Sequence, residues 1–281
     1  MSLAGNLFRF FLYSNLFIAC CATLMVHQTC RLLLHDKPDI YFTCFVFFAT
    51  LCSYSFHWYL TPPDANSSDR MLWLTRNRNV HGVFFFIGIF GAGAAALFLM
   101  EFWKSILLAV LITFLYSAPK LPYPYFKSLR TVALGKTIFL AFVWTYVTTI
   151  LPLIMSDRDW QIAFTLFAAS RFFFIYAICI LFDYRDREYD RSHGIRSLIT
   201  WLSEKGITYL FIASLLAFAF FTMAMTQYGL SFRIFLNLLA PAAITAALYS
   251  YAQKHFSDFL YYFILDGLMA TSALSSLIIG L

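Results

Sequence analysis

The densest charged segment of the chain runs from residue 183 to residue 196 and reads Asp-Tyr-Arg-Asp-Arg-Glu-Tyr-Asp-Arg-Ser-His-Gly-Ile-Arg. Asp183, Asp186 and Asp190 have the spacing i, i+3 and i+7, which places three carboxylates on one stripe if the preceding helix continues for two more turns. Three such carboxylates repel one another unless cations lie between them. Arginines flank the stripe, and carboxylates rimmed by arginines suit a divalent metal ion that holds a polyphosphate. The alternative interpretation is a solvated helix end with surface ion pairs. The flanking arginines are Arg185, Arg187 and Arg191.

A second polar segment follows an apolar stretch near residue 60. Pro62 and Pro63 end any helix there, so Asp64 and Asp69 are expected in a loop. His57 lies at the predicted membrane boundary, where it is either a ligand or, more commonly, a histidine hydrogen-bonded to the backbone.

A third polar segment, residues 116–130, carries three prolines within six residues and is therefore expected to be stiff and extended. Its basic and tyrosine side chains suit an anionic headgroup or a diphosphate. The alternative is the ordinary aromatic and basic belt of a membrane interface. The residues in question are Tyr116, Lys120, Lys127 and Arg130.

The composition places these segments in a membrane protein. Hydrophobic residues make up 61% of the 281 residues, charged residues only 12%, and 34 residues are Phe. A soluble domain carries about twice that charged fraction, and a chain that crosses lipid satisfies its backbone by forming helices. We expect a single polytopic domain over residues 1–281, all-α, with no nucleic-acid partner. The nine predicted spans are residues 10–28, 40–60, 82–100, 102–118, 132–154, 160–182, 207–226, 232–252 and 259–280.

The basic residues predict the orientation. Fourteen of the 20 Lys and Arg residues fall at the N-terminus, in the loops after spans two, four, six and eight, or just inside the adjoining span; five fall on the opposite side, and Arg171 lies inside span six. This bias places the N-terminus and the three polar segments in the cytoplasm and the C-terminus outside. The six cysteines include no Cys-x-x-Cys pair and are expected to be buried, inert thiols.

One carboxylate is expected inside a span. An unpaired Asp266 in the ninth span would cost several kcal/mol, so it should face a partner or a water-filled cavity. Arg171 lies toward the other membrane face and is not expected to be that partner.

The arrangement resembles the UbiA superfamily of intramembrane prenyltransferases, which have nine helices and Asp-rich motifs after helices 2 and 6. The family's second motif, Asp-x-x-x-Asp followed by Arg and a Gly, is similar to Asp186, Asp190, Arg191 and Gly194 here, with Asp183 one turn earlier. The Tyr-Ser-x-Pro-Lys stretch at residues 116–120 resembles the family's Tyr/Lys segment after helix 4. The resemblance covers essentially the whole chain.

The first motif departs from the family pattern Asn-x-x-x-Asp-x-x-x-Asp. The best register places Ser55, Tyr59 and Pro63 at its three positions, with Asp64 one residue late and Asp69 six. None of the three residues in register supplies a carboxylate to Mg²⁺. The resemblance implies Mg²⁺ ions that hold the donor diphosphate, so one Mg²⁺ would remain at the second motif and basic side chains would carry more of the diphosphate charge.

The resemblance implies a Mg²⁺-dependent transfer of a prenyl group from a polyprenyl diphosphate to an aromatic or other lipophilic acceptor at the cytoplasmic membrane face. Asp183, Asp186 and Asp190 would hold the metal, and these three with Lys120 would be catalytic. The predicted substrate-binding residues are Tyr116, Lys127, Arg130, Arg187, Arg191, Arg196, Ser55, His57, Tyr59, Asp64 and Asp69.

The degenerate first motif leaves open a non-catalytic relative that binds an isoprenoid or lipid or acts as a scaffold. A transporter is disfavoured, because the ionisable residues cluster at one interface and not at the bilayer midplane. A haem carrier would have only His57 and His81 as a ligand pair on one side of the membrane.

Overall fold

The computed structural model describes residues 3–61, 68–121, 136–192 and 197–279, and every regular element in these ranges is a helix. Nine of the described helices are long and apolar enough to cross a membrane. The chain is thus an all-α, multi-pass membrane protein, as predicted. The nine spans are Leu16–Leu34, Ile40–Tyr59, Arg78–Leu97, Met100–Lys120, Lys136–Ile154, Ile162–Ser192, Glu204–Tyr228, Phe232–Ala252 and Leu260–Ile278.

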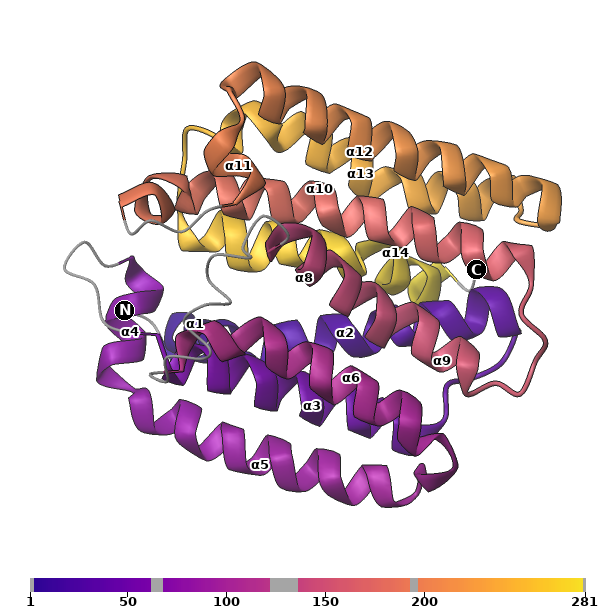
Figure 1. Cartoon of the computed structure of the whole chain (residues 1–281), viewed down its shortest axis with the longest axis horizontal. Helices are drawn as coiled ribbons and strands as arrows, with labels where there is room; N and C mark the ends of the chain where they lie inside the picture. Colours follow the sequence, from indigo (N-terminus) through magenta and orange to yellow (C-terminus); the bar gives the residue numbers. More distant parts are fainter. Residues whose placement is uncertain (1–2, 62–67, 122–135, 193–196, 280–281) are drawn as a thin grey trace.

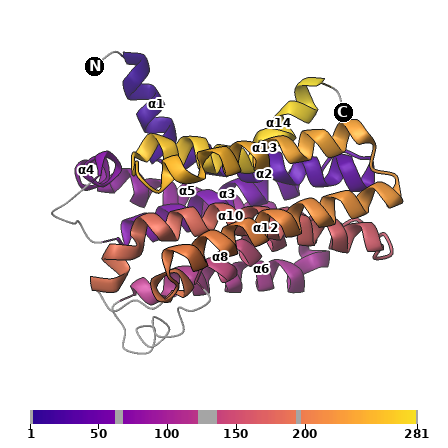
Figure 2. The same cartoon turned by 90° about the horizontal axis from the view of Figure 1, so that it is seen from above.

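These spans form a bundle of roughly aligned helices (Figure 1). The longest helix, α10, lies inside the bundle, is the most buried span, and packs against α8, α12, α13 and α14. The N-terminal helix α1 and the C-terminus lie at opposite ends of the bundle in both views (Figures 1 and 2). The labelled helices are α1 (Leu3–Tyr13), α2 (Leu16–Thr29), α3 (Ile40–Tyr59), α4 (Asp69–Arg76), α5 (Arg78–Leu97), α6 (Trp103–Ser117), α8 (Lys136–Thr145), α9 (Leu151–Ile154), α10 (Ile162–Ser192), α11 (Leu198–Trp201), α12 (Glu204–Ala224), α13 (Phe232–Ala252) and α14 (Asp266–Ile279).

The surface of the bundle is rich in large apolar side chains, as expected where lipid is the solvent. Phe90 is 74% exposed, Phe220 67% and Leu216 65%. The helix starts are set by polar caps in the connections: the Asp39 carboxylate accepts from the Phe42 N–H at 2.8 Å before α3. Ser203 caps α12 in the same way.

The first predicted span, residues 10–28, is wrong in its bounds. Asn15 adopts a left-handed conformation with φ 72°, which ends α1 and starts α2 in a new direction. Asn tolerates this conformation better than most residues. α1 therefore stands away from the bundle (Figure 2), and the spanning helix runs six residues further than predicted, to Leu34.

The sixth predicted span ends too early, with consequences for the charged segment. α10 continues ten residues beyond residue 182, to Ser192. The three aspartates therefore stand on the last turns of one long helix, at the end of the bundle where α4 and α11 also lie (Figure 1).

Candidate functional site

The end of α10 buries two of its three aspartates. The side chains of Asp183 and Asp190 are 8% and 4% exposed, whereas that of Asp186 is 40% exposed. A buried carboxylate needs a cation or several hydrogen bonds, because transfer out of water disfavours the charged form. The partners of these carboxylates therefore define the site.

The partner of the two buried carboxylates is Lys136, the first residue of α8. Its Nζ lies 3.8 Å from Asp183 Oδ1 and 3.6 Å from Asp190 Oδ2. Thr137, the next residue, donates a hydrogen bond to Asp183 Oδ2. α8 packs directly against α10, which places both side chains at the acidic stripe. Lys136 counted in the sequence only toward the orientation of the chain, because no local pattern connects it to Asp183, 47 residues further on.

Asp186 faces a different group of cations. Its Oδ1 accepts from Arg185 Nε at 2.9 Å, and Arg185 Nη2 donates to the Tyr262 hydroxyl at 3.0 Å. The charges of Arg185, Lys136 and Lys120 all act on the Asp186 carboxylate. Lys136 and Arg185 thus face the three aspartate carboxylates at one end of the bundle.

Lys120 enters this group at the end of the fourth span. Its Nζ donates to His57 Nε2 at 2.7 Å and to the Thr61 hydroxyl at 2.5 Å. The Tyr116 ring stacks on the His57 ring with a centroid distance of 5.4 Å, and His57 Nδ1 lies 3.3 Å from the Ser117 hydroxyl. The predicted site residues Tyr116, Lys120 and His57 are therefore brought together.

Other predicted residues make contacts of a different kind. Ser55 is buried and accepts from Asn15 Nδ2 at 3.3 Å, and the Tyr59 ring packs under the Arg78 guanidinium. Asp69 forms an exposed ion pair with Arg9 at 3.5 Å. His81 Nδ1 lies 3.3 Å from Asn15 Nδ2, whereas His57 contacts Lys120 and Ser117.

Two predicted phosphate-binding arginines turn toward neighbouring helices. Arg187 is buried, forms an ion pair with Glu204, and donates to the Leu202 carbonyl at 2.6 Å. Arg191 donates to the Thr200 carbonyl at 3.1 Å. Both arginines thus connect the end of α10 to the segment around α11 by hydrogen bonds. The predicted residues Asp64, Lys127, Arg130 and Arg196 lie outside the described residues.

Arg70, which the sequence did not single out, lies next to this group. It belongs to α4, its guanidinium sits 4.1 Å from the ring centroids of both Trp58 and Tyr262, and its Nη2 donates to Asn15 Oδ1 at 2.7 Å. Its backbone N–H donates to Asp258 Oδ2 at 2.6 Å. Burial lowers the pKa of Arg70 from its ordinary value, but arginine remains charged. The helix that follows the first polar segment thus supplies a buried cation next to the candidate site.

Asp266 begins α14 and is only partly buried. Besides its burial, the positive charges of Arg70 and Arg185 act on the Asp266 carboxylate. The expectation that Asp266 faces a partner stays a prediction.

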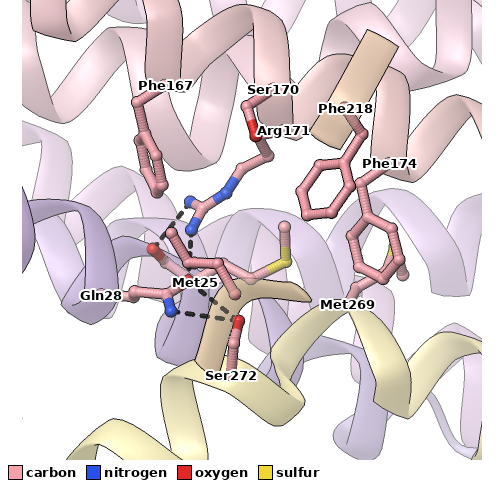
Figure 3. Close-up of a pocket in the computed structure, with 10 residues that line it drawn as sticks. Met25, Gln28, Phe167, Ser170, Arg171, Phe174, Phe218, Met269 and Ser272 are labelled. Atoms are coloured by element: carbon pink, nitrogen blue, oxygen red, sulfur yellow. Dashed lines mark hydrogen bonds between the residues drawn. The ribbon is translucent and has the colours of Figure 1, made fainter. Parts of the chain in front are cut away.

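Arg171, in the first third of α10, forms a separate polar centre (Figure 3). Its Nη2 donates to Gln28 Oε1 at 2.6 Å, and Gln28 Nε2 donates to the Ser272 hydroxyl at 3.0 Å. The adjacent cavity has a volume of about 20 Å³, which is room for about one water molecule. This centre therefore holds helices together and has no space for a substrate.

The donor set at the acidic stripe does not fit a magnesium ion held by all three aspartates. Mg²⁺ requires oxygen ligands at about 2.0–2.1 Å, whereas Asp183 and Asp190 both face Lys136 and Asp186 faces Arg185. Within the part of the chain that the structure describes, no group of three or more His, Cys, Asp or Glu side chains is placed to hold a metal ion. The magnesium site remains a prediction.

No protein-family profile matches the chain, and no curated protein matches it in sequence. The structure is similar to the apo structure of a UbiA homolog from Aeropyrum pernix K1, with a TM-score of 0.62 and 14% sequence identity over 95% of this chain and 97% of that chain. The predicted resemblance is therefore confirmed for the fold: the chain is a membrane helix bundle of the UbiA type.

Proposed function

We propose that the protein binds a polyprenyl diphosphate at the polar end of its bundle and transfers the prenyl group to a lipophilic acceptor. The observation that carries this proposal is a group of cations and carboxylates at one end of a UbiA-type bundle: Lys136 faces Asp183 and Asp190, and Arg185 faces Asp186. The charge of Lys120 also acts on Asp186. Ammonium and guanidinium groups bind phosphate oxygens by charge-assisted hydrogen bonds. The prenyl tail would lie among apolar side chains.

The proposed reaction breaks the C–O bond between the prenyl group and the diphosphate. The bonding electron pair stays on the diphosphate oxygen, the acceptor supplies the pair for the new bond, and the acceptor then loses a proton. Cations already positioned at the leaving group stabilise the charge that develops there, and such preorganised groups supply a large part of catalysis. Lys120, Lys136 and Arg185 suit this role. Lys127, Arg130 and Arg196 are predicted to add further positive charge.

Binding is tested with a radiolabelled polyprenyl diphosphate and detergent-purified protein. A hydrogen bond to a charged group contributes about 1.5–3 kcal/mol, so Lys120→Met is expected to weaken binding by roughly 10- to 100-fold. Lys254→Met removes the same charge from an exposed position at the end of α13 and should bind as the wild type does. Absence of saturable binding to the wild-type protein would refute the proposal.

A non-catalytic isoprenoid-binding or scaffold protein is the second candidate. The first motif favours this candidate, because Ser55 and Tyr59 carry no carboxylate for a metal ion. Ser55 contacts Asn15, and Tyr59 contacts Arg78. Release of inorganic pyrophosphate, measured with the bound donor and a membrane lipid extract as the acceptor source, separates the two. Release that Lys120→Met abolishes indicates a transferase, whereas binding without release indicates the second candidate.

A further inference from the structure

The ammonium of Lys136 occupies the position between two buried carboxylates that a bound metal ion would need. Asp183 and Asp190 are seven residues apart, about 10 Å along the axis of α10, yet both carboxylates turn toward the same nitrogen, at 3.8 Å and 3.6 Å. Asp190 Oδ2 has no hydrogen-bond partner among the described residues, so its neutralisation depends on this ammonium. A metal ion that joined these two oxygens would have to displace Lys136.

Cations of the chain itself already face the carboxylates of this group. Lys136 lies beside Asp183 and Asp190, and Arg185 lies beside Asp186, so a cation of the chain already faces each of the three carboxylates. A buried pair of carboxylates is unfavourable unless a cation neutralises it. Lys136 is a residue of the chain itself, so its ammonium is present beside the pair without any bound ion. The side chain of Lys136 is also 32% exposed, so it is accessible from outside the pair.

An ammonium has three N–H donors. The distances from Lys136 Nζ to the two carboxylates, 3.8 Å and 3.6 Å, are those of ion pairs and are longer than hydrogen bonds, so an incoming oxygen atom can accept from the ammonium. A phosphate oxygen that approaches from the exposed side would therefore meet Lys136 directly.

We propose that Lys136 is the resident cation of the second Asp-rich motif: it excludes divalent metal ions from the Asp183–Asp190 pair and contacts a phosphate oxygen of the ligand itself. This inference rests on the proposed function for the identity of the ligand. The exclusion of metal does not depend on it. Diphosphate binding should consequently survive removal of divalent cations.

The metal part is tested by Mn²⁺ binding, measured by electron paramagnetic resonance on purified protein without diphosphate. Lys136→Met frees the carboxylate pair and should bind Mn²⁺ at least about tenfold more tightly than the wild type. Lys136→Met combined with Asp190→Asn should lose that gain. Lys254→Met, which removes an exposed lysine, should behave as the wild type does. Failure of Lys136→Met to bind Mn²⁺ more tightly would overturn the inference.

Wild type and Asp190→Asn provide a second comparison that does not require the Lys136 variant to fold. Equal Mn²⁺ binding by the two supports exclusion of metal from the pair. Mn²⁺ binding by the wild type that Asp190→Asn abolishes would overturn the inference.

The ligand part is tested by diphosphate binding in the presence of a chelator. Binding that persists with chelator and that Lys136→Met weakens supports the role of Lys136. Binding that requires Mg²⁺ would overturn this inference while leaving the proposed function intact. No binding under either condition would refute the proposed function and the ligand role together, while the Mn²⁺ measurements would still decide whether metal is excluded.

Discussion

At the scale of single residues, the buried Arg171 stabilises the bundle by hydrogen bonds to neighbouring helices. Its Nη1 lies within hydrogen-bonding distance of the Met25 carbonyl at 2.9 Å, the Thr29 hydroxyl at 2.8 Å and the Thr148 carbonyl at 3.2 Å. Thr148 belongs to a π-helical turn, Tyr146–Ile150, whose altered hydrogen bonding suits such an extra donor. Arg171 thus joins α10, α2 and the π-helical turn inside the membrane.

Replacement of Arg171 by Met should destabilise the bundle. Each hydrogen bond within a membrane contributes about 0.6 kcal/mol on average, so loss of the several bonds of Arg171 should cost about 2–3 kcal/mol. Thermal unfolding in detergent should show a lower midpoint for Arg171→Met, whereas Arg233→Met at the exposed start of α13 should leave the midpoint unchanged. An unchanged midpoint for Arg171→Met would contradict this role.

The individual residues of the candidate site were predictable to different degrees. Spacing within one helix predicted that Asp183, Asp186 and Asp190 lie on the same helix end. The sequence did not reveal Lys136 or Arg70, because their roles depend on contacts with helices far away in the chain. Arg187 and Arg191 contact carbonyl groups around α11, which no local pattern indicated, and their phosphate contacts stay a prediction.

At the scale of helices, α3 and α5 form an unusually close pair. A Cβ atom added at Gly88 would lie 2.7 Å from the backbone nitrogen of Cys52, and one at Gly91 would lie 2.5 Å from the Phe48 ring. Small residues allow such close approach in membranes, where packing drives helix association. Gly93 on the same helix has no atom within 4 Å of the added position.

This contrast predicts different effects for the same substitution on one helix. Gly88→Ala must push α3 and α5 apart and should lower the unfolding midpoint, with a cost of about 1–3 kcal/mol. Gly93→Ala has open space and a favourable helix propensity, so its midpoint should be equal or slightly higher. Equal midpoints for both variants, measured in the same detergent, would show that α3 and α5 do not pack this closely.

Apolar length predicted the number and approximate position of the described spans because lipid thickness imposes a minimum on each one. It did not predict the break at Asn15, where local hydrogen bonding to Arg70 and His81 accompanies the left-handed conformation. It also missed the extension of α10, because polar residues beyond the bilayer carry no hydropathy signal. The break at Asn15 and the length of α10 therefore depend on tertiary contacts, which hydropathy does not report.

At the scale of the whole molecule, the three aspartates of α10 and the cations that face them gather at one end of the bundle. The three aspartates of α10, Lys120 and Lys136 belong to the end of the bundle that also carries α4 and α11 (Figure 1). The connection between α9 and α10 lies at the opposite end. The positive-inside rule therefore predicts that the acidic and basic group faces the cytoplasm.

Cysteine labelling tests this orientation. Lys254→Cys lies at the end of α13, and Asp159→Cys lies in the connection before α10; both positions are exposed. A membrane-impermeant maleimide should label Asp159→Cys in intact cells and Lys254→Cys only after the membrane is opened. The wild-type protein, whose six free cysteines lie within the spans, gives the background signal. The reverse pattern would place the candidate site outside the cell, where a cytoplasmic pool of prenyl diphosphate could not reach it, and would contradict the orientation on which the proposed function depends.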